Sequence, residues 1–355
     1  MTRIEKLWNR IKDNSDGMII TSETNQLYFT DFKYSDGYLI VTKGKGYLIT
    51  DFRYAEAAKK YESPTLSVVI FGGLADGKIK SIFEENNVNS LLVEDSIPLS
   101  QYDALKRQFP DINFNSDKDA VCAMREYKSQ IEVDCIIKAQ RIAEKSLDEL
   151  LKNFDRNMTE KHLAAYLEYL MKKNGADGIS FNTIAVSGKA SSLPHGVPRD
   201  NKLENGFLTI DFGATYKGYH SDMTRTYCIG RADDEMKKVY NTVLEAQNRA
   251  IDAIMQGERN CVKIDNISRS HIYSQGYEGC FGHGLGHGVG LVIHESPRLS
   301  PKAPSDKMLD VGHVVTVEPG IYIENKYGVR IEDMIYMSVN GPQNITKMPK
   351  NLIEL

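Results

Sequence analysis

Two aspartates stand in neighbouring stretches whose apolar composition predicts buried β-strands. Asp211 lies in the run 208–213 and Asp222 in the run 220–226, with a turn expected at 216–218 between them. We expect a hairpin that places the two carboxylates roughly opposite one another. Two buried carboxylates at that separation repel, so one is protonated unless a cation binds both. The structural alternative is that one of the two side chains points to solvent.

A second pair of acids repeats this pattern. Glu318 lies in the run 314–323 and Glu332 in the run 328–334, and both runs are rich in β-branched residues, which favour strands that bury side chains. Four buried acids in two hairpins need a shared counter-charge, and a divalent metal is the usual one. For Glu332 alone, a salt bridge to Arg330 stays open as an alternative.

Histidines and glycines gather in the segment 281–298. Of the eight histidines in the chain, His283, His287 and His294 all lie here, and glycine occupies every other position from 282 to 290. Such glycines would let the backbone pass close to a bound ion or substrate. One imidazole among carboxylates favours manganese and leaves cobalt, zinc and iron open. The clustering makes His287 the expected ligand, whereas spacing alone assigns His283 to packing against a turn.

Other catalytic motifs are incomplete. Residues 211–213 spell Asp-Phe-Gly, as in protein kinases, but no H-R-D loop or glycine-rich ATP loop accompanies them. The sequence contains no G-x-G-x-x-G, P-loop, H-E-x-x-H or G-x-S-x-G motif. These absences exclude a protein kinase, a dinucleotide-binding enzyme and a serine hydrolase.

The elements expected to position these residues form two domains. After about residue 125, helical periodicity predicts four helices, at 131–150, from the N-cap Thr159 to Lys173, at 234–255 and at 262–274. Each helix pair precedes one acid-bearing hairpin. The first ~120 residues alternate between short strands and helices. We expect a smaller α/β domain over residues 1–120 and a larger one over 121–355.

The strands expected in the first domain are short apolar runs, and a tight turn is expected at Lys45-Gly46. These runs are 18–20, 27–29, 38–41, 47–49, 66–71 and 91–93. The helices expected between the later strands are 54–60, 78–85 and 100–109.

Composition bounds the remaining possibilities. The chain is 41% hydrophobic and 26% charged, with a formal net charge of -4 and no block of like charge, so neither a nucleic-acid nor a membrane partner is expected. No signal-peptide pattern and no apolar run of ~18 residues is present, so we expect a cytoplasmic address. Five widely spaced cysteines without a C-x-x-C pair argue against a disulfide framework and against a thiolate metal site.

With these motifs, the sequence resembles the pita-bread metallopeptidases, which include methionine aminopeptidase, aminopeptidase P and prolidase. The resemblance extends from residues 125–129 to residues 330–332 and covers nearly the whole second domain. Through residues 28–32 and 51–54, the first domain more loosely resembles the creatinase-like N-terminal domain of the proline-specific branch. The implied fold is α/β (α+β): a pita-bread catalytic domain preceded by a smaller creatinase-like α/β domain.

The resemblance implies two divalent metal ions, most simply manganese, and assigns their ligands. The implied ligands are Asp211, Asp222, His287, Glu318 and Glu332. Asp211 would bind one ion with both oxygens, and Asp222 and Glu332 would bridge the pair. His287 and Glu318 would complete the coordination of the other ion.

The resemblance also implies roles for residues around the metal ligands. Glu318 would act as the general base, His294 would contact the scissile carbonyl or its tetrahedral intermediate, and His195 would lie near the scissile bond. Along the substrate pocket we expect His283, Arg298 and Arg330.

The implied activity is hydrolysis of the bond between an N-terminal residue and a following proline, in peptides or dipeptides, by a homodimer. The additional N-terminal domain disfavours methionine aminopeptidase. We expect an Xaa-Pro aminopeptidase, with an Xaa-Pro dipeptidase (prolidase) as the alternative. A metal-free creatinase-like enzyme or a binding scaffold is disfavoured, because such relatives lose metal ligands and this chain retains all five.

Overall fold

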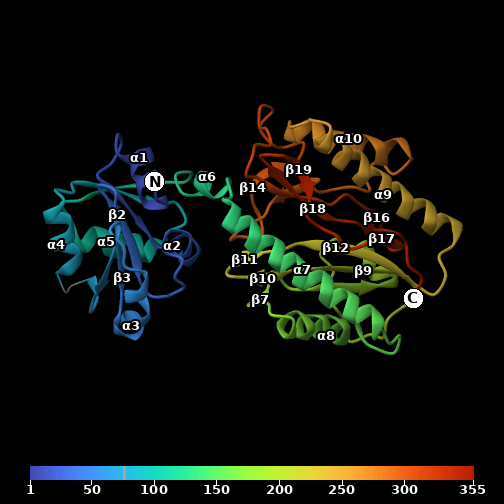
Figure 1. The fold of residues 1–355 in the computed structure, drawn as a ribbon. Coiled ribbons are helices and arrows are strands. Elements are labelled where there is room, and N and C mark those ends of the chain that lie inside the picture. The colour runs from blue at the N-terminus through green and yellow to red at the C-terminus, as the bar shows by residue number, and fades with distance from the viewer. Residues whose placement is uncertain (75–76) are drawn as a thin grey trace. The chain divides into compact units, whose positions relative to one another are not determined.

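The computed structural model describes residues 1–74 and 77–355, which form two compact units, Met1–Arg125 and Glu126–Leu355 (Figure 1). The boundary expected after residue 120 falls just before the short helix α6 (Cys122–Arg125), which closes the first unit. Within the described ranges, no helix combines the length and the apolar character needed to cross a membrane.

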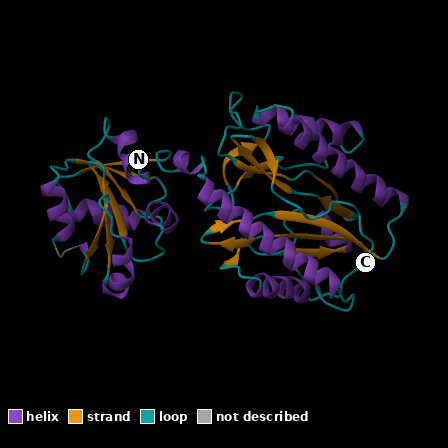
Figure 2. Ribbon diagram, in the orientation of Figure 1, coloured by secondary structure: helices purple, strands orange, loops and turns teal. Residues whose placement is uncertain are grey.

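The first unit is built on a six-stranded mixed sheet with helices around it (Figure 2). In sheet order its strands are β4 (Leu66–Ile70), β3 (Lys45–Thr50), β2 (Tyr38–Thr42), β1 (Gly17–Ile20), β5 (Ser90–Glu94) and β6 (Asn113–Asp117). Its longer helices are α1 (Arg3–Ile11), α2 (Glu23–Thr30), α4 (Lys78–Glu85) and α5 (Leu99–Gln108). The stretch expected to be helical at 54–60 is the four-residue helix α3 (Ala55–Ala58) between two 3₁₀ turns.

Two local predictions for this unit are wrong. Residues 27–29 belong to helix α2, which begins after the N-cap Ser22, because a short apolar run fits a helix as well as a strand. The tight turn lies at Lys43-Gly44, where both residues have positive φ, as a two-residue hairpin turn of type I′ requires. Strand β3 therefore begins at Lys45, where the turn was expected.

In the first half of the second unit, two helices pack beside an antiparallel sheet. Helices α7 (Gln130–Lys152) and α8 (Glu160–Lys173) begin after the N-caps Ser129 and Thr159. The sheet contains β8 (Ile184–Ser187), β9 (Gly206–Phe212) and β12 (Met223–Ile229), and the strands β7 (Gly178–Ile179), β10 (Ala214–Tyr216) and β11 (Tyr219–His220) form a smaller sheet. Buried residues of α7, α8 and β9 form one apolar core.

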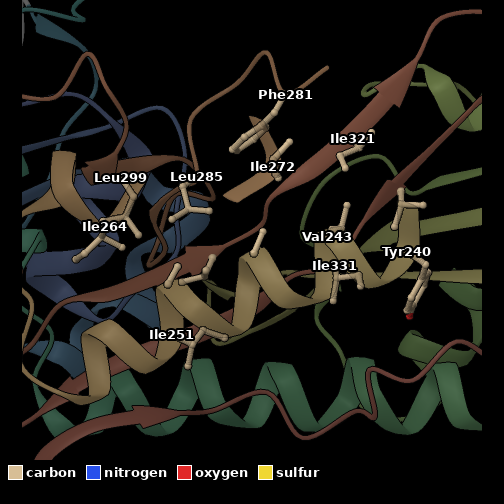
Figure 3. Packing of buried hydrophobic residues seen from close by; sticks show 14 of the residues in the cluster. Tyr240, Val243, Ile251, Ile264, Ile272, Phe281, Leu285, Leu299, Ile321 and Ile331 are labelled. Carbon is tan, nitrogen blue, oxygen red and sulfur yellow. The ribbon is translucent and has the colours of Figure 1, made fainter. Parts of the chain in front are cut away.

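The second half repeats this arrangement. Helices α9 (Asp234–Met255) and α10 (Cys261–Ser274) pack on a five-stranded sheet and a two-stranded ribbon, through a core cluster that includes Val243, Ile264 and Ile331 (Figure 3). The sheet contains β14 (Glu295–Leu299), β13 (Gly286–Gly288), β15 (Val314–Val317), β18 (Asp333–Ser338) and β19 (Gly341–Asn344), and the ribbon contains β16 (Gly320–Ile323) and β17 (Tyr327–Arg330).

The acids lie where the strands of the two hairpins pass from one sheet to the next. Asp211 lies in β9 opposite Thr224 of β12, and Asp222 immediately precedes β12, so the expected hairpin is present. Glu318 follows β15, and Glu332 immediately precedes β18. The two halves therefore carry their acids at equivalent positions in their strand order.

A buried histidine links the stability of the second unit to pH. His313 is 0% exposed, lies just before β15, and accepts a hydrogen bond at Nδ1 from the backbone N–H of Asp310 (3.1 Å). Its ring packs against Tyr127. Burial, with the nearby charge of Lys128, lowers the pKa of His313 to about 4, against the opposing influence of Glu126.

We expect the free energy of unfolding to decrease as the pH falls from about 6.5 to about 4. In this window the unfolded histidine binds a proton while the folded one stays neutral, which destabilises the native state by at most roughly 3 kcal/mol. His313→Gln should flatten this part of a pH series of chemical denaturation curves. The exposed His162, replaced in the same way, serves as the control, and an unchanged slope in His313→Gln would contradict the assignment.

Candidate metal centre

The five expected metal ligands lie on the wall of one cavity in the second unit. This cavity has a volume of about 910 Å³. The ligands come from both hairpins and from β13, and all five line it: Asp211, Asp222, His287, Glu318 and Glu332. Residues more than 100 positions apart in the sequence thus meet at one point.

The closest group within this set is Asp222, His287 and Glu332. One nitrogen or oxygen atom from each lies within 4.8 Å of the others, and all three side chains are buried. The Nε2 atom of His287 lies 3.2 Å from Oε1 of Glu318 and 3.5 Å from Oδ2 of Asp222. Three of the five expected ligands therefore converge as a bound cation requires, and Glu318 contacts one of them, His287.

The His287 ring is oriented by its own strand. Its Nδ1 lies 3.1 Å from the carbonyl oxygen of Gly288, and because a carbonyl only accepts, Nδ1 carries the proton of this hydrogen bond. In the neutral ring, the lone pair of Nε2 then faces the carboxylates of Glu318 and Asp222. Lone pairs that face one another in a buried site need a cation between them.

Two of the acids keep one oxygen without a hydrogen bond. Oδ2 of Asp211 accepts from Arg330 (2.7 Å) and Oε2 of Glu332 accepts from the hydroxyl of Thr224 (2.8 Å). The other oxygens, Oδ1 of Asp211 and Oε1 of Glu332, are buried and have no hydrogen-bond partner. A buried carboxylate oxygen left in this state is strongly unfavourable, so both are suited to bind a cation.

The raised pKa values of two acids give a second reason to expect a cation in this site. Burial, followed by the charges of Asp211 and Glu318, raises the pKa of Asp222 well above its ordinary value. Burial and the charges of Asp222 and Glu318 likewise raise the pKa of Glu332 well above its ordinary value. Without a cation, burial and the neighbouring charges therefore favour the protonated form of both groups. The donor set of carboxylates with one imidazole fits divalent metal ions, which would replace those protons.

Glu318 behaves differently from the other acids. Burial alone would raise the pKa of its carboxyl, but a protonated His287, through its hydrogen bond and charge, together with the charges of His283 and Arg330, would lower it to about 2. The hydroxyl of Thr316 also donates to its Oε1 (3.2 Å). Glu318 is therefore the acid of this centre whose pKa depends most directly on the protonation of His287.

Arg330 makes a different ion pair from the one that its sequence position suggests. It binds Asp211 rather than Glu332, and it reaches Glu332 only through Thr224, whose hydroxyl accepts from Nε of Arg330 (3.1 Å). Its guanidinium also donates to the hydroxyl of Tyr322 (2.7 Å). The salt-bridge explanation for Glu332 is therefore wrong, and Arg330 instead orients the acids.

His283 belongs to the same hydrogen-bond network. Its Nδ1 donates to the carbonyl of Gly284 (2.8 Å), and its Nε2 accepts from the hydroxyl of Tyr322 (3.0 Å). The ring lines the cavity, but both nitrogens are already engaged. Sequence reasoning missed Tyr322, Thr224 and Thr316, because hydroxyl residues inside β-rich runs carry no signal of their own.

The remaining expected residues, His195, His294 and Arg298, line the same cavity. His294 packs edge to face against His287, with ring centroids 4.4 Å apart. Partial burial, with the charges of His287 and Arg298, lowers the pKa of His294 to about 4, so its ring is neutral at physiological pH. Arg298 lies opposite His287 in the β13–β14 pair, and His195 lies in the loop after the 3₁₀ turn Gly188–Ser192.

Two glycines of the run are required by the packing of the strands. A Cβ atom on Gly286 would lie 2.0 Å from the carbonyl oxygen of Thr316, and one on Gly288 would lie 2.2 Å from that of Ser296. These glycines let β13 fit between β14 and β15 with the backbones in close contact. The close packing of β13 thus fixes the position of His287, and Gly286 also lines the cavity.

Comparison with known proteins extends these observations to both units. Residues 134–338 match the model of metallopeptidase family M24, and residues 3–127 match the creatinase/prolidase N-terminal domain. A Xaa-Pro dipeptidase of Pyrococcus furiosus is 38% identical over 354 residues, which is 99% of each chain.

Solved structures show the same likeness. The structure of a Xaa-Pro dipeptidase from Bacillus anthracis is similar with a TM-score of 0.93 and 37% identity, over 99% of both chains. That of an X-Pro aminopeptidase from Thermotoga maritima is similar with a TM-score of 0.89 and 35% identity, over 98% of this chain and 100% of the other.

Removal of one acid should have opposite effects with and without metal. In chelator-treated protein, Asp222→Asn should raise the melting temperature, because it relieves repulsion among buried acids. With Mn²⁺ at about 100 times its Kd, the wild type should gain about 2.7 kcal/mol of stability and the variant much less. Thermal unfolding and metal analysis after dialysis measure both effects.

The control for this experiment is Asp306→Asn, which replaces an exposed aspartate outside the cluster. It should respond to Mn²⁺ as the wild type does. Equal stabilisation of Asp222→Asn by Mn²⁺ would remove Asp222 from the metal centre.

Proposed function

Because this chain belongs to metallopeptidase family M24 and carries a creatinase/prolidase N-terminal domain, we propose that it is an Xaa-Pro dipeptidase. It would hydrolyse the bond between the first residue and the proline of a dipeptide. The observation that carries the proposal is the convergence of four carboxylates and one imidazole in a single cavity. The expected family and fold, a pita-bread catalytic domain after a creatinase-like domain, are confirmed.

The relatives favour the dipeptidase over the aminopeptidase expected from the sequence. Both the P. furiosus relative and the B. anthracis structure carry the name Xaa-Pro dipeptidase. An X-Pro aminopeptidase is the second candidate, supported by the name of the T. maritima structure and by a cavity of about 910 Å³, which is larger than a dipeptide requires.

We assign two divalent ions, with manganese as the proposed metal, to the five donors. Asp222 and Glu332 would bridge the ions, while Asp211 would hold one of them and His287 and Glu318 the other. When bound, such ions supply a water acidified enough to act as a nucleophile and polarise the scissile carbonyl. The homodimer implied by the resemblance stays a prediction.

Glu318 is the proposed general base. Its carboxyl lines the cavity beside the other proposed ligands, where it can take a proton from the attacking water. The proton would then pass to the proline nitrogen, which leaves as a secondary amine. Proline offers no N–H for recognition, so its ring must be held by the shape of the cavity.

His294 is the proposed stabiliser of the tetrahedral intermediate. Its neutral ring carries one N–H at physiological pH, and it faces the cavity beside His287. An N–H placed there would donate to the oxygen that gains charge as the carbonyl is attacked. His195, on the same cavity, would assist in positioning the scissile bond.

The other residues of the network would orient substrate and ligands. Arg298 makes no ion pair among the described residues and would bind the carboxylate of the dipeptide. Arg330, in contrast, already binds Asp211 and Tyr322, so we assign it to the orientation of the acids, and His283 to the wall of the cavity.

Substrate preference tests the proposed function directly. With Mn²⁺, the protein should cleave Xaa-Pro faster than Xaa-Pro-Xaa and should leave Xaa-Ala intact, and a chelator should abolish the activity. Glu318→Gln should lower kcat by roughly 10²–10⁴, because the general base is lost. The exposed Glu278, replaced in the same way, should leave kcat unchanged. Failure to cleave either proline substrate would refute the proposal.

The role of His294 predicts a loss of rate without a loss of metal. His294→Ala should lower kcat by roughly 10²–10³, as expected for the loss of one hydrogen bond to the oxyanion, while metal content stays at the wild-type level. His294→Gln, which keeps an N–H donor, should recover part of the rate. A kcat in His294→Ala equal to that of the wild type would remove this residue from the chemistry.

A further inference from the structure

The charges that line the cavity are arranged unevenly. Among the described residues of its wall, the acids are the four of the metal centre and no others. Three further cations of the cavity, Arg298, Lys302 and Lys307, come from one stretch of chain, which forms a basic wall. A zwitterionic peptide would therefore place its amino group at the acids and its carboxylate at the basic wall.

Two of these cations are available to a ligand. Lys307 Nζ lies 2.7 Å from Oε2 of Glu126, so its charge is largely compensated within the protein. Arg298 and Lys302 are exposed to the cavity, and neither forms an ion pair with any residue in 1–74 or 77–355. The basic wall thus carries two positive charges that no carboxylate of the described residues neutralises.

The chain that carries Lys302 is held by successive turns. The backbone N–H of Lys302 donates to the hydroxyl of Ser300 (3.2 Å), and that of Ala303 donates to the carbonyl of Ser300 (3.1 Å). The N–H of Lys307 then donates to the carbonyl of Pro304 (3.0 Å). The base of the Lys302 side chain is therefore fixed, while its four-carbon stem can adjust to a ligand.

The two free cations hold different positions relative to the proposed metal ligands. Arg298 stands inside β14, directly opposite His287 of β13. Lys302 lies beyond the end of β14 at Leu299. Arg298 is therefore the cation that the strand pair holds beside a proposed ligand, and Lys302 is carried by the turns that follow.

We propose that Lys302 is a second carboxylate site, which binds the C-terminus of a tripeptide Xaa-Pro-Xaa while Arg298 binds that of a dipeptide. One additional residue moves the terminal carboxylate ~3.5 Å further from the scissile bond, so that it would pair with a second cation of the same wall rather than with Arg298. Lysine, a flexible point charge, suits a carboxylate whose position varies with the third residue. This proposal rests on the proposed function and makes Lys302 the residue that sets tolerance of chain length.

The test compares dipeptide and tripeptide acids with their amides. Lys302→Ala should raise KM for Xaa-Pro-Xaa, or its Ki against Xaa-Pro cleavage, roughly five- to tenfold relative to the KM for Xaa-Pro. The C-terminally amidated tripeptide should bind the wild type and Lys302→Ala equally, because it has no carboxylate. Lys302→Arg should restore the preference, and the wild-type preference should weaken as salt rises.

A lysine outside the cavity, Lys152, provides the matched control, and Lys152→Ala should leave the ratio of the two constants unchanged. Equal effects of Lys302→Ala on Xaa-Pro and Xaa-Pro-Xaa, or an effect that persists with the amide, would overturn the proposal. If the protein cleaves neither substrate, the proposed function fails, but calorimetric binding of the tripeptide acid and amide to wild type and Lys302→Ala still decides the role of Lys302.

Discussion

Repulsion among buried carboxylates is the constraint around which the second unit is organised. Asp222 and Glu332 are almost completely buried, and their pKa values rise because other acids surround them. Proteins tolerate such a cluster only when protons or cations neutralise it. The hydrogen bonds from Arg330 and Thr224 orient the acids but satisfy only one oxygen each on Asp211 and Glu332. The other oxygen of each acid, Oδ1 of Asp211 and Oε1 of Glu332, has no hydrogen-bond partner and is suited to bind a cation.

Two structurally similar halves of the second unit bring these acids together. In each half, two helices cover a sheet, and a hairpin carries its acids at the points where strands pass between sheets. Strand β13 adds the single imidazole, and glycines 286 and 288 allow it to lie close to its neighbours. The rigidity of packed strands thus sets distances that loops alone would hold less well.

Sequence reasoning located most of the elements and the residues that the cavity gathers. Helix α9 begins and ends at the residues that helical periodicity predicted, 234 and 255, because periodicity is a local property of the sequence. Residues 27–29 and the turn at Lys43-Gly44 were misassigned, since a short apolar run or a single glycine fits several structures. The partners of Arg330 and His283 depend on contacts across more than 30 residues of sequence, which spacing does not encode.

The division of the metal centre between two halves has a consequence for how the protein is made. Asp211 and Asp222 come from the first half, whereas His287, Glu318 and Glu332 come from the second. A nascent chain that has emerged only as far as β12 has two acids, too few to retain an ion against the cellular pool. With the proposed ligands, metal loading would follow synthesis of β17 and the residues after it, which would make it a late step in maturation.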